Sequence, residues 1–280
     1  MPNTYVDRQG NNNTRIHLVS FATSNYASAI EPFVSEALRT NWFHRITIYS
    51  ELDLHPVVLK YCNETASFGR GFGFYIWKPI ICRDAMQSLP DNDIFVYLDI
   101  GFSFNPSGEA RLAEYVATIT PPESPGMLVF QMTPNIEIPF EEFNHSKREV
   151  FEEFGFEQNH SVYNTGVILA GAFMLRINKP NKALIQKWYE VCISNPNLLL
   201  EAPTDPSLVQ HPGFKVNRND QPIFSLLCKK HAFSPVDASE ILPELHGSSG
   251  VLDMRNCPFW ALRRRTSLIL RGLNDPIMPK

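Results

Sequence analysis

The amino-acid sequence predicts an α/β fold, in which one mostly parallel central sheet carries helices on both faces, in a single domain. Apolar segments of strand length alternate along the chain with segments whose apolar residues recur at helical spacing. No internal repeat and no Gly/Ser-rich linker divides the 280 residues, a length that one large α/β domain can reach. With 44% apolar and 19% charged residues, the chain has enough apolar material for such a core.

The predicted elements follow one another in order. Strands are predicted over 15–23, 45–54, 94–99 and 162–178. Helices are predicted over 28–40, 79–90, 180–194 and 219–233, the second of them opened by Pro79 after a glycine-rich loop. The stretch 105–160 is rich in Pro and Glu and mixes helical and loop signals.

The two ends of the chain are predicted to differ from the main domain, which we place at 15–255. Residues 1–14 are polar and rich in asparagine, which predicts disorder. Residues 256–280 carry three adjacent arginines, 263–265, followed by apolar residues at 268–270. Such a segment can make a peripheral contact with an anionic membrane surface or pack one face on its own domain, and we favour packing.

Charge and cysteine content exclude several classes of protein. A net charge of −4 and a pI of about 6.1 do not indicate a partner as acidic as nucleic acid. The five cysteines are far apart and form no CxxC pair, which favours reduced thiols over a disulfide framework or a zinc site. The longest apolar stretch is far shorter than the roughly 20 residues of a membrane helix, and no signal-peptide pattern opens the sequence. We therefore expect a cytoplasmic protein that binds no nucleic acid.

One predicted strand ends on a charge. The segment IFVYLD contains five apolar or aromatic residues and ends at Asp99, and Gly101 follows two residues later. In an open α/β sheet, ligands bind outside the carboxyl ends of the strands, so Asp99 would present a carboxylate there. Gly101 would let the backbone turn close to a ligand. The alternative is that Asp99 merely opens a tight turn with glycine.

Four short motifs extend this pattern. They are GFGFYIWKP at 71–79, YLDIG at 97–101, YNTGVIL at 163–169 and NDQPIFSLLCKK at 219–230. In order and spacing, over about 15–230, they resemble those of GT-A-type glycosyltransferases, in particular the group in which a WKP segment precedes a YLD-x-G strand end. The resemblance implies the GT-A fold and the transfer of a hexose or pentose from a nucleotide-diphosphate sugar, most often UDP-linked, to a hydroxyl of a glycan acceptor. The alternative is a carbohydrate- or nucleotide-binding module on a catalytically inactive GT-A scaffold.

The resemblance implies that the first two strands and the glycine-rich loop bind the donor. The residues that would meet the nucleotide base and ribose are Ser20, Phe21, Ala22, Thr23 and Tyr49. From the residues alone, aromatic side chains on strands are more often core than base-stacking platforms. Arg70 and Lys78 would hold the diphosphate, because the start of a helix favours phosphate. A solvated surface lysine is the alternative for Lys78.

A divalent metal, Mn²⁺ or Mg²⁺, is the cofactor that the resemblance implies. The usual motif is D-x-D, but here Gly101 stands in the third position and Asp99 is the one carboxylate left. Phosphate oxygens and water can supply most ligands of such an ion, and strict metal dependence is left open. Related retaining families complete the site with a histidine before a glycine, which His246 matches. The alternative for His246 is an ordinary loop histidine.

Asp220 is the candidate for the transfer chemistry. From the residues alone, Asn219 or Asp220 could be a helix N-cap. The resemblance implies that Asp220 faces the transferred sugar, where it takes the acceptor proton in an inverting enzyme or stabilises the oxocarbenium-like centre in a retaining one. The residues that would contact the sugar or acceptor are Asn164, Thr165 and Gln221. For the first two, a β-bulge or turn is the alternative.

Other enzyme classes lack their sequence signatures. The first strand is not followed by the G-x-G-x-x-G of a dinucleotide-binding fold, and the sequence has no G-x-x-x-x-G-K-S/T phosphate loop. The glycine-rich opening loop of a sugar nucleotidyltransferase is also missing. A glycoside hydrolase would need two carboxylates around the scissile bond. Asp99 and Asp220 could be that pair, but the α/β pattern and the WKP segment argue against it.

Overall fold

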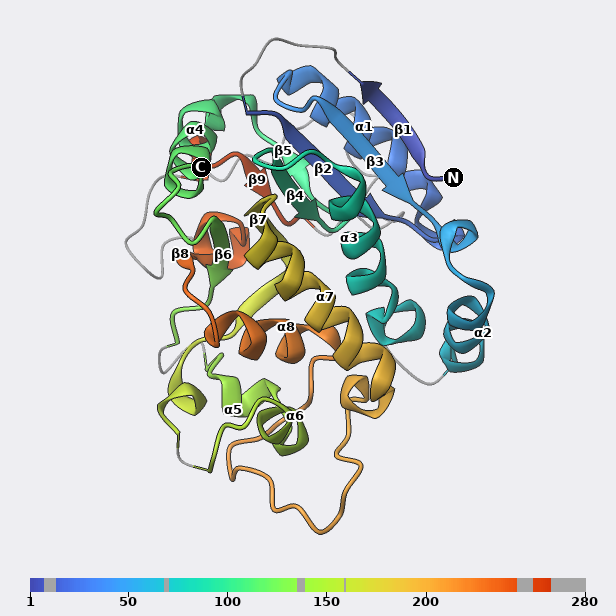
Figure 1. Ribbon diagram of the computed structural model, residues 1–280, viewed down its shortest axis with the longest axis vertical. Helices are drawn as coiled ribbons and strands as arrows, with labels where there is room; N and C mark the ends of the chain where they lie inside the picture. The colour runs from blue at the N-terminus through green and yellow to red at the C-terminus, as the bar shows by residue number, and fades with distance from the viewer. Residues whose placement is uncertain (8–13, 68–70, 135–138, 159, 246–253, 263–280) are drawn as a thin grey trace.

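The computed structural model describes residues 1–7, 14–67, 71–134, 139–158, 160–245 and 254–262. A seven-stranded sheet runs through the middle of the molecule in the order β1-β3-β2-β4-β7-β6-β8 (Figure 1). Its strands are β1 (Asn3–Asp7), β2 (Ile16–Phe21), β3 (Arg45–Tyr49), β4 (Ile94–Leu98), β6 (Met127–Gln131), β7 (Ile168–Arg176) and β8 (Ser234–Asp237).

Most strands of this sheet point the same way. β1 is antiparallel to β3, and β7 lies antiparallel between β4 and β6. The other neighbours pair in parallel, so all the described strands of this sheet except β1 and β7 share one direction. The predicted mostly parallel sheet is confirmed. Because β7 runs against β4, the beginning of β7 lies beside the carboxyl end of β4, where the predicted ligand edge is.

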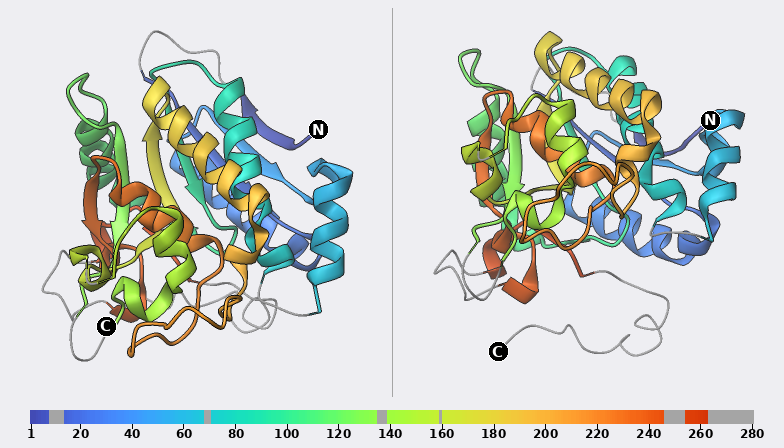
Figure 2. Two further views of the ribbon diagram at one scale, coloured as in Figure 1. Left: turned by 60° about the horizontal axis from the view of Figure 1, so that its bottom comes forward. Right: turned by 90° about the horizontal axis from the view of Figure 1, so that it is seen from below.

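Helices cover both faces of the sheet, as predicted. One face carries α1 (Ala27–Thr40) and α4 (Glu109–Ile119), and the other carries α3 (Trp77–Ser88), α7 (Lys179–Ser194) and α8 (Asp220–Lys229). Figure 2 shows α3 and α7 side by side, with α8 next to α7. The buried side chains of β4 alternate between the two cores, with Phe95 and Tyr97 on one side and Val96 and Leu98 on the other. Burial on both faces explains the continuous apolar run of this strand.

The predicted helices are confirmed, with small changes at their ends. The segment 28–40 is α1, 180–194 is α7, and 219–233 is the shorter α8. The helix α3 begins at Trp77, so Pro79 stands in its first turn, where a missing backbone N–H costs nothing. The other α-helices of the described residues are α2 (Pro56–Thr65), α5 (Glu142–His145) and α6 (Arg148–Glu153).

Three described strands of the seven-stranded sheet were not predicted. Residues Asn3–Asp7 form β1, so the expected disorder over 1–14 is wrong for this part. The segment contains Thr, Tyr and Val, which favour strands, and the open edge of β3 gives it a partner. β6 lies inside the stretch whose Pro and Glu content obscured a short apolar run, and β8 has a proline within it. The predicted strand over 162–178 begins only at Ile168, because Ser161–Asn164 form a 3-10 turn.

The beginning of the C-terminal segment packs on the domain. β9 (Phe259–Trp260) pairs antiparallel with β5 (Ser103–Phe104), and Phe259 is fully buried. Ala261 N donates a hydrogen bond to Ile241 O at 2.8 Å. Residues 263–280, which include the three arginines, lie outside the described residues. No helix in the described part of the chain is both long and apolar enough to cross a membrane.

Candidate active site

The ammonium group of Lys78 is the centre of a buried polar cluster at the carboxyl end of β4. Lys78 Nζ lies 3.4 Å from Asp99 Oδ1 and 3.2 Å from Asp220 Oδ2. It also donates a hydrogen bond to Ala170 O at 3.3 Å. Asp99 follows β4, Asp220 begins α8 and Ala170 lies in β7. One lysine side chain, 3% exposed, therefore joins three segments that are far apart in the sequence.

A left-handed turn leads into the helix that carries Lys78. Gly73, Phe74 and Tyr75 have φ angles of 63°, 53° and 64°, a region that non-glycine residues rarely adopt. Holding Phe74 and Tyr75 there costs on the order of 1–3 kcal/mol each, and such strain gathers at functional sites. A Cβ at Gly73 would come within 2.4 Å of Cys62 Sγ, so this position requires glycine on two counts.

Aromatic rings surround the Lys78 ammonium. Lys78 Nζ lies 5.0 Å from the ring centroid of Tyr75, 5.4 Å from that of Tyr97 and 5.8 Å from that of Trp77. The negative faces of such rings attract a cation. They compensate in part for the hydration that the buried ammonium has lost. The Tyr97 hydroxyl also donates a hydrogen bond to Asp99 Oδ1 at 2.7 Å, so the same ring orients the neighbouring carboxylate.

Asp99 is the exposed member of the cluster. Its side chain is 43% exposed, whereas that of Asp220 is 5% exposed. The backbone N–H of Asp99 donates to Gly171 O at 2.9 Å across the β4–β7 pair. A Cβ at Gly171 would stand 2.7 Å from Asp99 Oδ2, so glycine there leaves room for the carboxylate. Gly101 lies in the turn that follows, which Phe102 N closes by donating to Asp99 O at 3.0 Å.

Asp220 is the first residue of α8, and its carboxylate faces Lys78. The preceding residue, Asn219, stands at the N-cap position, but its side chain accepts no hydrogen bond from the helix amides. Instead Asn219 Nδ2 donates to Leu199 O at 2.9 Å. The N-cap alternative for Asn219 therefore does not describe this helix end. Its backbone, with φ 55° and ψ −115°, is also strained, although its ψ differs from the left-handed helical values of the turn before α3.

Burial and charge set the ionisation of the cluster. Burial raises the pKa of the Asp220 carboxyl to about 6; the adjacent Lys78 ammonium acts against this shift, and the Asp99 carboxylate adds to it. Burial alone would lower the pKa of Lys78, but the carboxylates of Asp220 and Asp99 outweigh it and raise the lysine pKa above its ordinary value. The lysine therefore stays charged, and Asp220 can change its protonation near neutral pH.

The predicted nucleotide contacts at the end of the first strand lie close to this cluster. Phe21 stacks on Trp77, with ring centroids 3.8 Å apart, and is 4% exposed. Ser20 is fully buried on the opposite face of the strand, and its Oγ has no hydrogen-bond partner among the described residues. Ala22 N donates to Tyr49 O at 3.0 Å, and Thr23 O accepts from Tyr26 N at 2.8 Å. The stacking partner of Phe21 in this structure is thus a protein ring.

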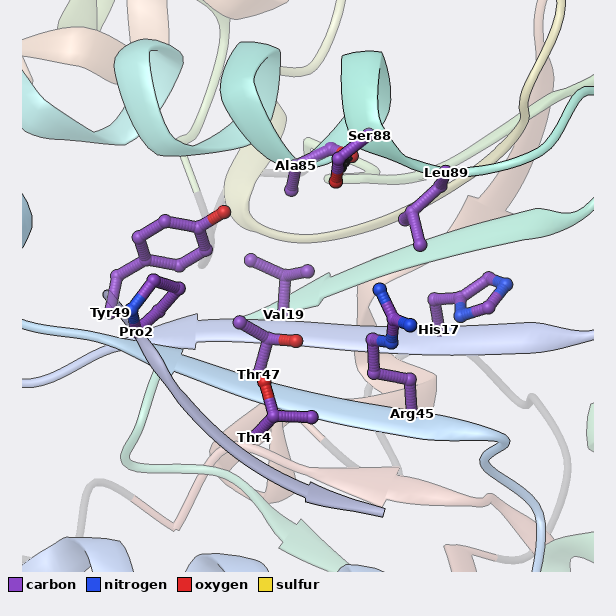
Figure 3. Close-up of a pocket in the computed structure, with 10 residues that line it drawn as sticks. All are labelled: Pro2, Thr4, His17, Val19, Arg45, Thr47, Tyr49, Ala85, Ser88 and Leu89. Carbon is purple, nitrogen blue, oxygen red and sulfur yellow. Dashed lines mark hydrogen bonds between the residues drawn. The ribbon is translucent and has the colours of Figure 1, made fainter. Parts of the chain in front are cut away.

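Tyr49 faces a different cavity. Its side chain lines a space of about 90 Å³ between β1, β2 and β3 on one side and α3 on the other (Figure 3). His17 and Arg45 line the same cavity toward the other end of these strands, and none of Lys78, Asp99 and Asp220 belongs to its lining. Burial raises the pKa of Tyr49 to about 12. The structure does not bring Tyr49 into the Lys78 cluster.

The predicted sugar contacts divide between two places. Thr165 Oγ1 accepts a hydrogen bond from Lys229 Nζ at 2.8 Å, at the opposite end of α8 from Asp220. A ten-residue helix is about 15 Å long, so Thr165 and Asp220 are separated by roughly that length. Asn164 is exposed at the end of a 3-10 turn. Gln221 directly follows Asp220, and its Nε2 is buried without a hydrogen-bond partner among the described residues.

Two predicted residues, Arg70 and His246, lie outside the described residues. Within the described ranges, no group of three or more His, Cys, Asp or Glu side chains could hold a metal ion by itself. Asp99 is the predicted metal ligand that the structure describes, and its half-exposed carboxylate leaves room for ligands from outside the protein.

The residues that the prediction missed have only weak signals in the sequence. Tyr97 belongs to the quoted YLDIG motif, and Ala170 and Gly171 are small residues in an otherwise bulky strand. Small residues in a strand indicate close approach of other groups, but they do not say which group approaches. That Lys78 contacts carboxylates could not be read from the chain, because its partners are distant in sequence.

No protein-family model and no curated protein matches the sequence. Similar solved structures include a glycosyltransferase involved in the glycosylation of the major capsid of PBCV-1, with a TM-score of 0.47 and 10% identity over 88% of this chain and 92% of that one. Mouse xyloside xylosyltransferase 1 gives a TM-score of 0.42 and 10% identity over 90% and 98%. The galactosyltransferase LgtC, in complex with donor and acceptor sugar analogs, gives 0.43 and 12% over 87% and 86%. At these values the likeness carries no argument about activity, which has to come from the side chains of the site.

Proposed function

We propose that this protein is a glycosyltransferase that moves a hexose or pentose from a nucleotide-diphosphate sugar, UDP-linked, to a hydroxyl group of a glycan acceptor. The observation that carries the proposal is the Lys78 cluster, in which one ammonium holds a buried and a half-exposed carboxylate together. The cluster lies at the carboxyl edge of an α/β sheet, where ligands bind. The WKP, YLDIG and NDQ motifs, whose order resembles that of GT-A-type enzymes, supply its three charged side chains.

In this proposal Asp220 carries the chemistry of transfer. A pKa of about 6 places the carboxyl near the pH at which a general base works best. In an inverting reaction Asp220 takes the proton of the acceptor hydroxyl, and in a retaining reaction it stabilises positive charge at the anomeric carbon. The burial of Asp220 strengthens either effect, since water does not screen its charge. Gln221 and the exposed Asn164 are proposed to contact the sugar or the acceptor.

Asp99 is proposed to face the diphosphate of the donor. A Mn²⁺ or Mg²⁺ ion takes several oxygen ligands and often shares one or two protein carboxylates with substrate phosphates. The 43% exposure of Asp99 fits an ion shared with the donor in this way. When bound, the ion would neutralise charge on the leaving diphosphate. Arg70 and His246 remain proposed contacts of the diphosphate and the metal.

Lys78 acts on the carboxylates rather than directly on the diphosphate in this proposal. An ammonium group has three N–H donors, and Lys78 has Asp99, Asp220 and Ala170 O within 3.4 Å. The predicted direct contact with phosphate is therefore replaced by a positioning role. The nucleotide base and ribose are proposed to meet the segment Ser20–Thr23, which ends beside Trp77.

The test is a screen of nucleotide-sugar donors, read both as protection against thermal unfolding and as donor turnover, with and without Mn²⁺. We expect one donor to stabilise the protein and to be hydrolysed or transferred, and turnover to disappear in Asp220→Asn. Stabilisation by a donor without turnover of any donor would instead support the binding-module alternative. No stabilisation by any nucleotide sugar or nucleoside diphosphate would contradict both.

A further inference from the structure

We infer that Asn219 is a positioning residue, whose strained backbone aims the Asp220 carboxylate at Lys78. The role of this aim in catalysis rests on the function proposed above for Asp220. The geometry itself does not depend on that function. It involves the residue before α8, its side-chain amide and the segment that the amide holds.

The backbone of Asn219 is unusual even among residues with positive φ. Asn41, which ends α1, has φ 61° and ψ 19°, the ordinary left-handed helical region. Asn219 has a similar φ of 55°, but its ψ of −115° takes it outside that region. A residue with a Cβ is strained in this conformation, and such strain persists only where the surroundings impose it.

Hydrogen bonds from side-chain amides connect this strained residue and its neighbour to the segment Leu198–Leu200. Asn219 is 3% exposed, and its Nδ2 donates to Leu199 O at 2.9 Å. Asn217 Nδ2 donates to the two flanking carbonyls, Leu198 O at 2.9 Å and Leu200 O at 3.0 Å. Three consecutive carbonyls therefore hold the two asparagines, and the segment that leads into α8 cannot rotate freely.

The direction of the Asp220 side chain follows from this arrangement. Asp220 comes directly after Asn219, so the ψ angle of Asn219 sets the orientation of the peptide unit that joins the two. A return of ψ from −115° to an ordinary left-handed value would rotate this unit relative to the fixed Leu199 carbonyl. The 3.2 Å contact between Asp220 Oδ2 and Lys78 Nζ would then be lost unless the whole helix moved.

The amide of Asn219 supplies the hydrogen bond to Leu199 O. Glycine would lose this bond but would adopt the backbone conformation without strain, because it has no Cβ. Alanine would lose the bond and keep the strain. Asn217→Ala is a matched control, because it removes the neighbouring amide contacts and leaves the residue before Asp220 unchanged.

The experiment follows the titration of the Asp220 carboxyl by NMR in protein labelled with ¹³C-aspartate, with the signal assigned from Asp220→Asn. In Asn219→Ala we expect the Asp220 titration midpoint to rise by one pH unit or more, because the contact with the Lys78 ammonium, which opposes the upward shift of the Asp220 pKa, is lost. With the donor found in the screen, kcat should fall tenfold or more and KM should stay within about threefold. Asn219→Gly should titrate like the wild type, and Asn217→Ala should lower the melting temperature with the midpoint unchanged.

Several outcomes would overturn the inference. A folded Asn219→Ala variant that titrates like the wild type would do so, and so would a folded Asn219→Gly variant with a moved midpoint. An equal shift in Asn217→Ala would show general loosening of the loop. An alanine variant that does not fold, beside a glycine variant that folds and titrates normally, supports the need for the strained backbone. If Asn219→Ala moves the midpoint but the wild type turns over no donor, the inference stands and the proposed function fails.

Discussion

The helix α8 carries a buried lysine–carboxylate contact at each of its ends. At its first residue, Asp220 lies against Lys78, which also contacts Asp99. At the last residue of the helix, Lys229 Nζ lies 2.5 Å from Glu142 Oε1. Lys229 also donates to Gly166 O at 2.7 Å, as Lys78 does to Ala170 O. Each lysine thus pairs with a carboxylate and donates to a backbone carbonyl, one within β7 and one just before it. The two clusters differ in the ratio of carboxylates to ammonium groups and in exposure to solvent.

The cluster around Glu142 is closed. One carboxylate faces one ammonium, Glu142 is fully buried, and the hydroxyls of Ser146 and Ser225 donate to its two oxygens. In the Lys78 cluster, two carboxylates share a single ammonium and one of them is 43% exposed. A buried pair of one carboxylate and one ammonium has a structural role, because removing either partner would leave an uncompensated charge. Two carboxylates that share one ammonium have excess negative charge, and where one of them is exposed to solvent the site can bind a cation or exchange a proton.

The largest expected effect is a loss of kcat on substitution of Asp220, which would show that the Lys78 cluster carries the chemistry. Asp220→Asn keeps the size of the side chain and removes its charge, so proton abstraction and charge stabilisation are both lost. Loss of a general base typically lowers the rate 10²–10⁴-fold, so kcat should fall by about that factor while donor KM changes little. Steady-state kinetics measures this. A variant that keeps more than about a tenth of wild-type kcat would place the base elsewhere.

The second largest expected effect is a loss of stability on substitution of Lys229, which would show that the Glu142 cluster is structural. Lys229→Met leaves Glu142 fully buried without its ammonium, which typically costs about 3–5 kcal/mol in the free energy of unfolding. Urea denaturation measures the loss, and kcat per folded molecule should stay within about twofold. A loss below about 1 kcal/mol, or a large fall in kcat with full folding, would mean that this cluster is not the structural one.

A smaller effect tests the open side of the Lys78 cluster. Asp99→Ala should abolish the Mn²⁺-dependent thermal stabilisation by a nucleoside diphosphate, worth about 2.7 kcal/mol at a hundredfold excess over Kd. The melting temperature of the ligand-free protein should change little, since Asp99 is 43% exposed. Asp84→Ala is the matched control, because its side chain is 44% exposed and pairs with Arg83 instead. Equal Mn²⁺-dependent stabilisation of Asp99→Ala and wild type would end the assignment.

The sequence was enough to predict four strands of the sheet, β2, β3, β4 and β7, and four helices, α1, α3, α7 and α8. β4 and β7 are covered on both faces and therefore read as apolar runs, and α1 and α7 have regular apolar spacing. β1 was missed because an edge strand gains its stability from a partner that the local composition does not show. β6 was missed because its short apolar run lies in a stretch dominated by Pro and Glu.

Only part of the candidate site could be predicted. The positions of Asp99 and Asp220 follow from local rules, since one ends a buried strand and the other begins a helix. The lysine between them does not, because burial of an ammonium depends on groups that only the tertiary fold supplies. The sugar or acceptor contact of Thr165 stays a prediction, and the hydrogen bond that its hydroxyl accepts from Lys229 could not be foreseen for the same reason. Neither the composition nor the residue spacing of the sequence indicates the strained backbone conformation of Asn219.

The smallest expected effect shows what Lys78 does for Asp220. Burial raises the pKa of Asp220 to about 6, and the Lys78 ammonium opposes the shift, so Lys78→Met should raise this pKa further. If ionised Asp220 is required, kcat/KM rises with pH through the folded-state pKa. The half-maximal pH should lie near 6 in the wild type and at least one unit higher in Lys78→Met, a loss of about fivefold or more near pH 6 that recovers at higher pH.

The pH dependence of the free energy of unfolding gives an independent check that the pKa of Asp220 is raised in the folded protein. The folded protein holds the Asp220 proton more tightly than the unfolded chain does, so this group makes the free energy of unfolding fall as pH rises from about 4 to 6. In Lys78→Met the fall should extend to higher pH. Lys229→Met, which leaves Asp220 untouched, should keep the wild-type midpoint of the rate profile. If Lys78→Met and wild type share one midpoint, the Lys78 ammonium does not control the pKa of Asp220, and the two lysines of the α8 clusters both serve only the fold.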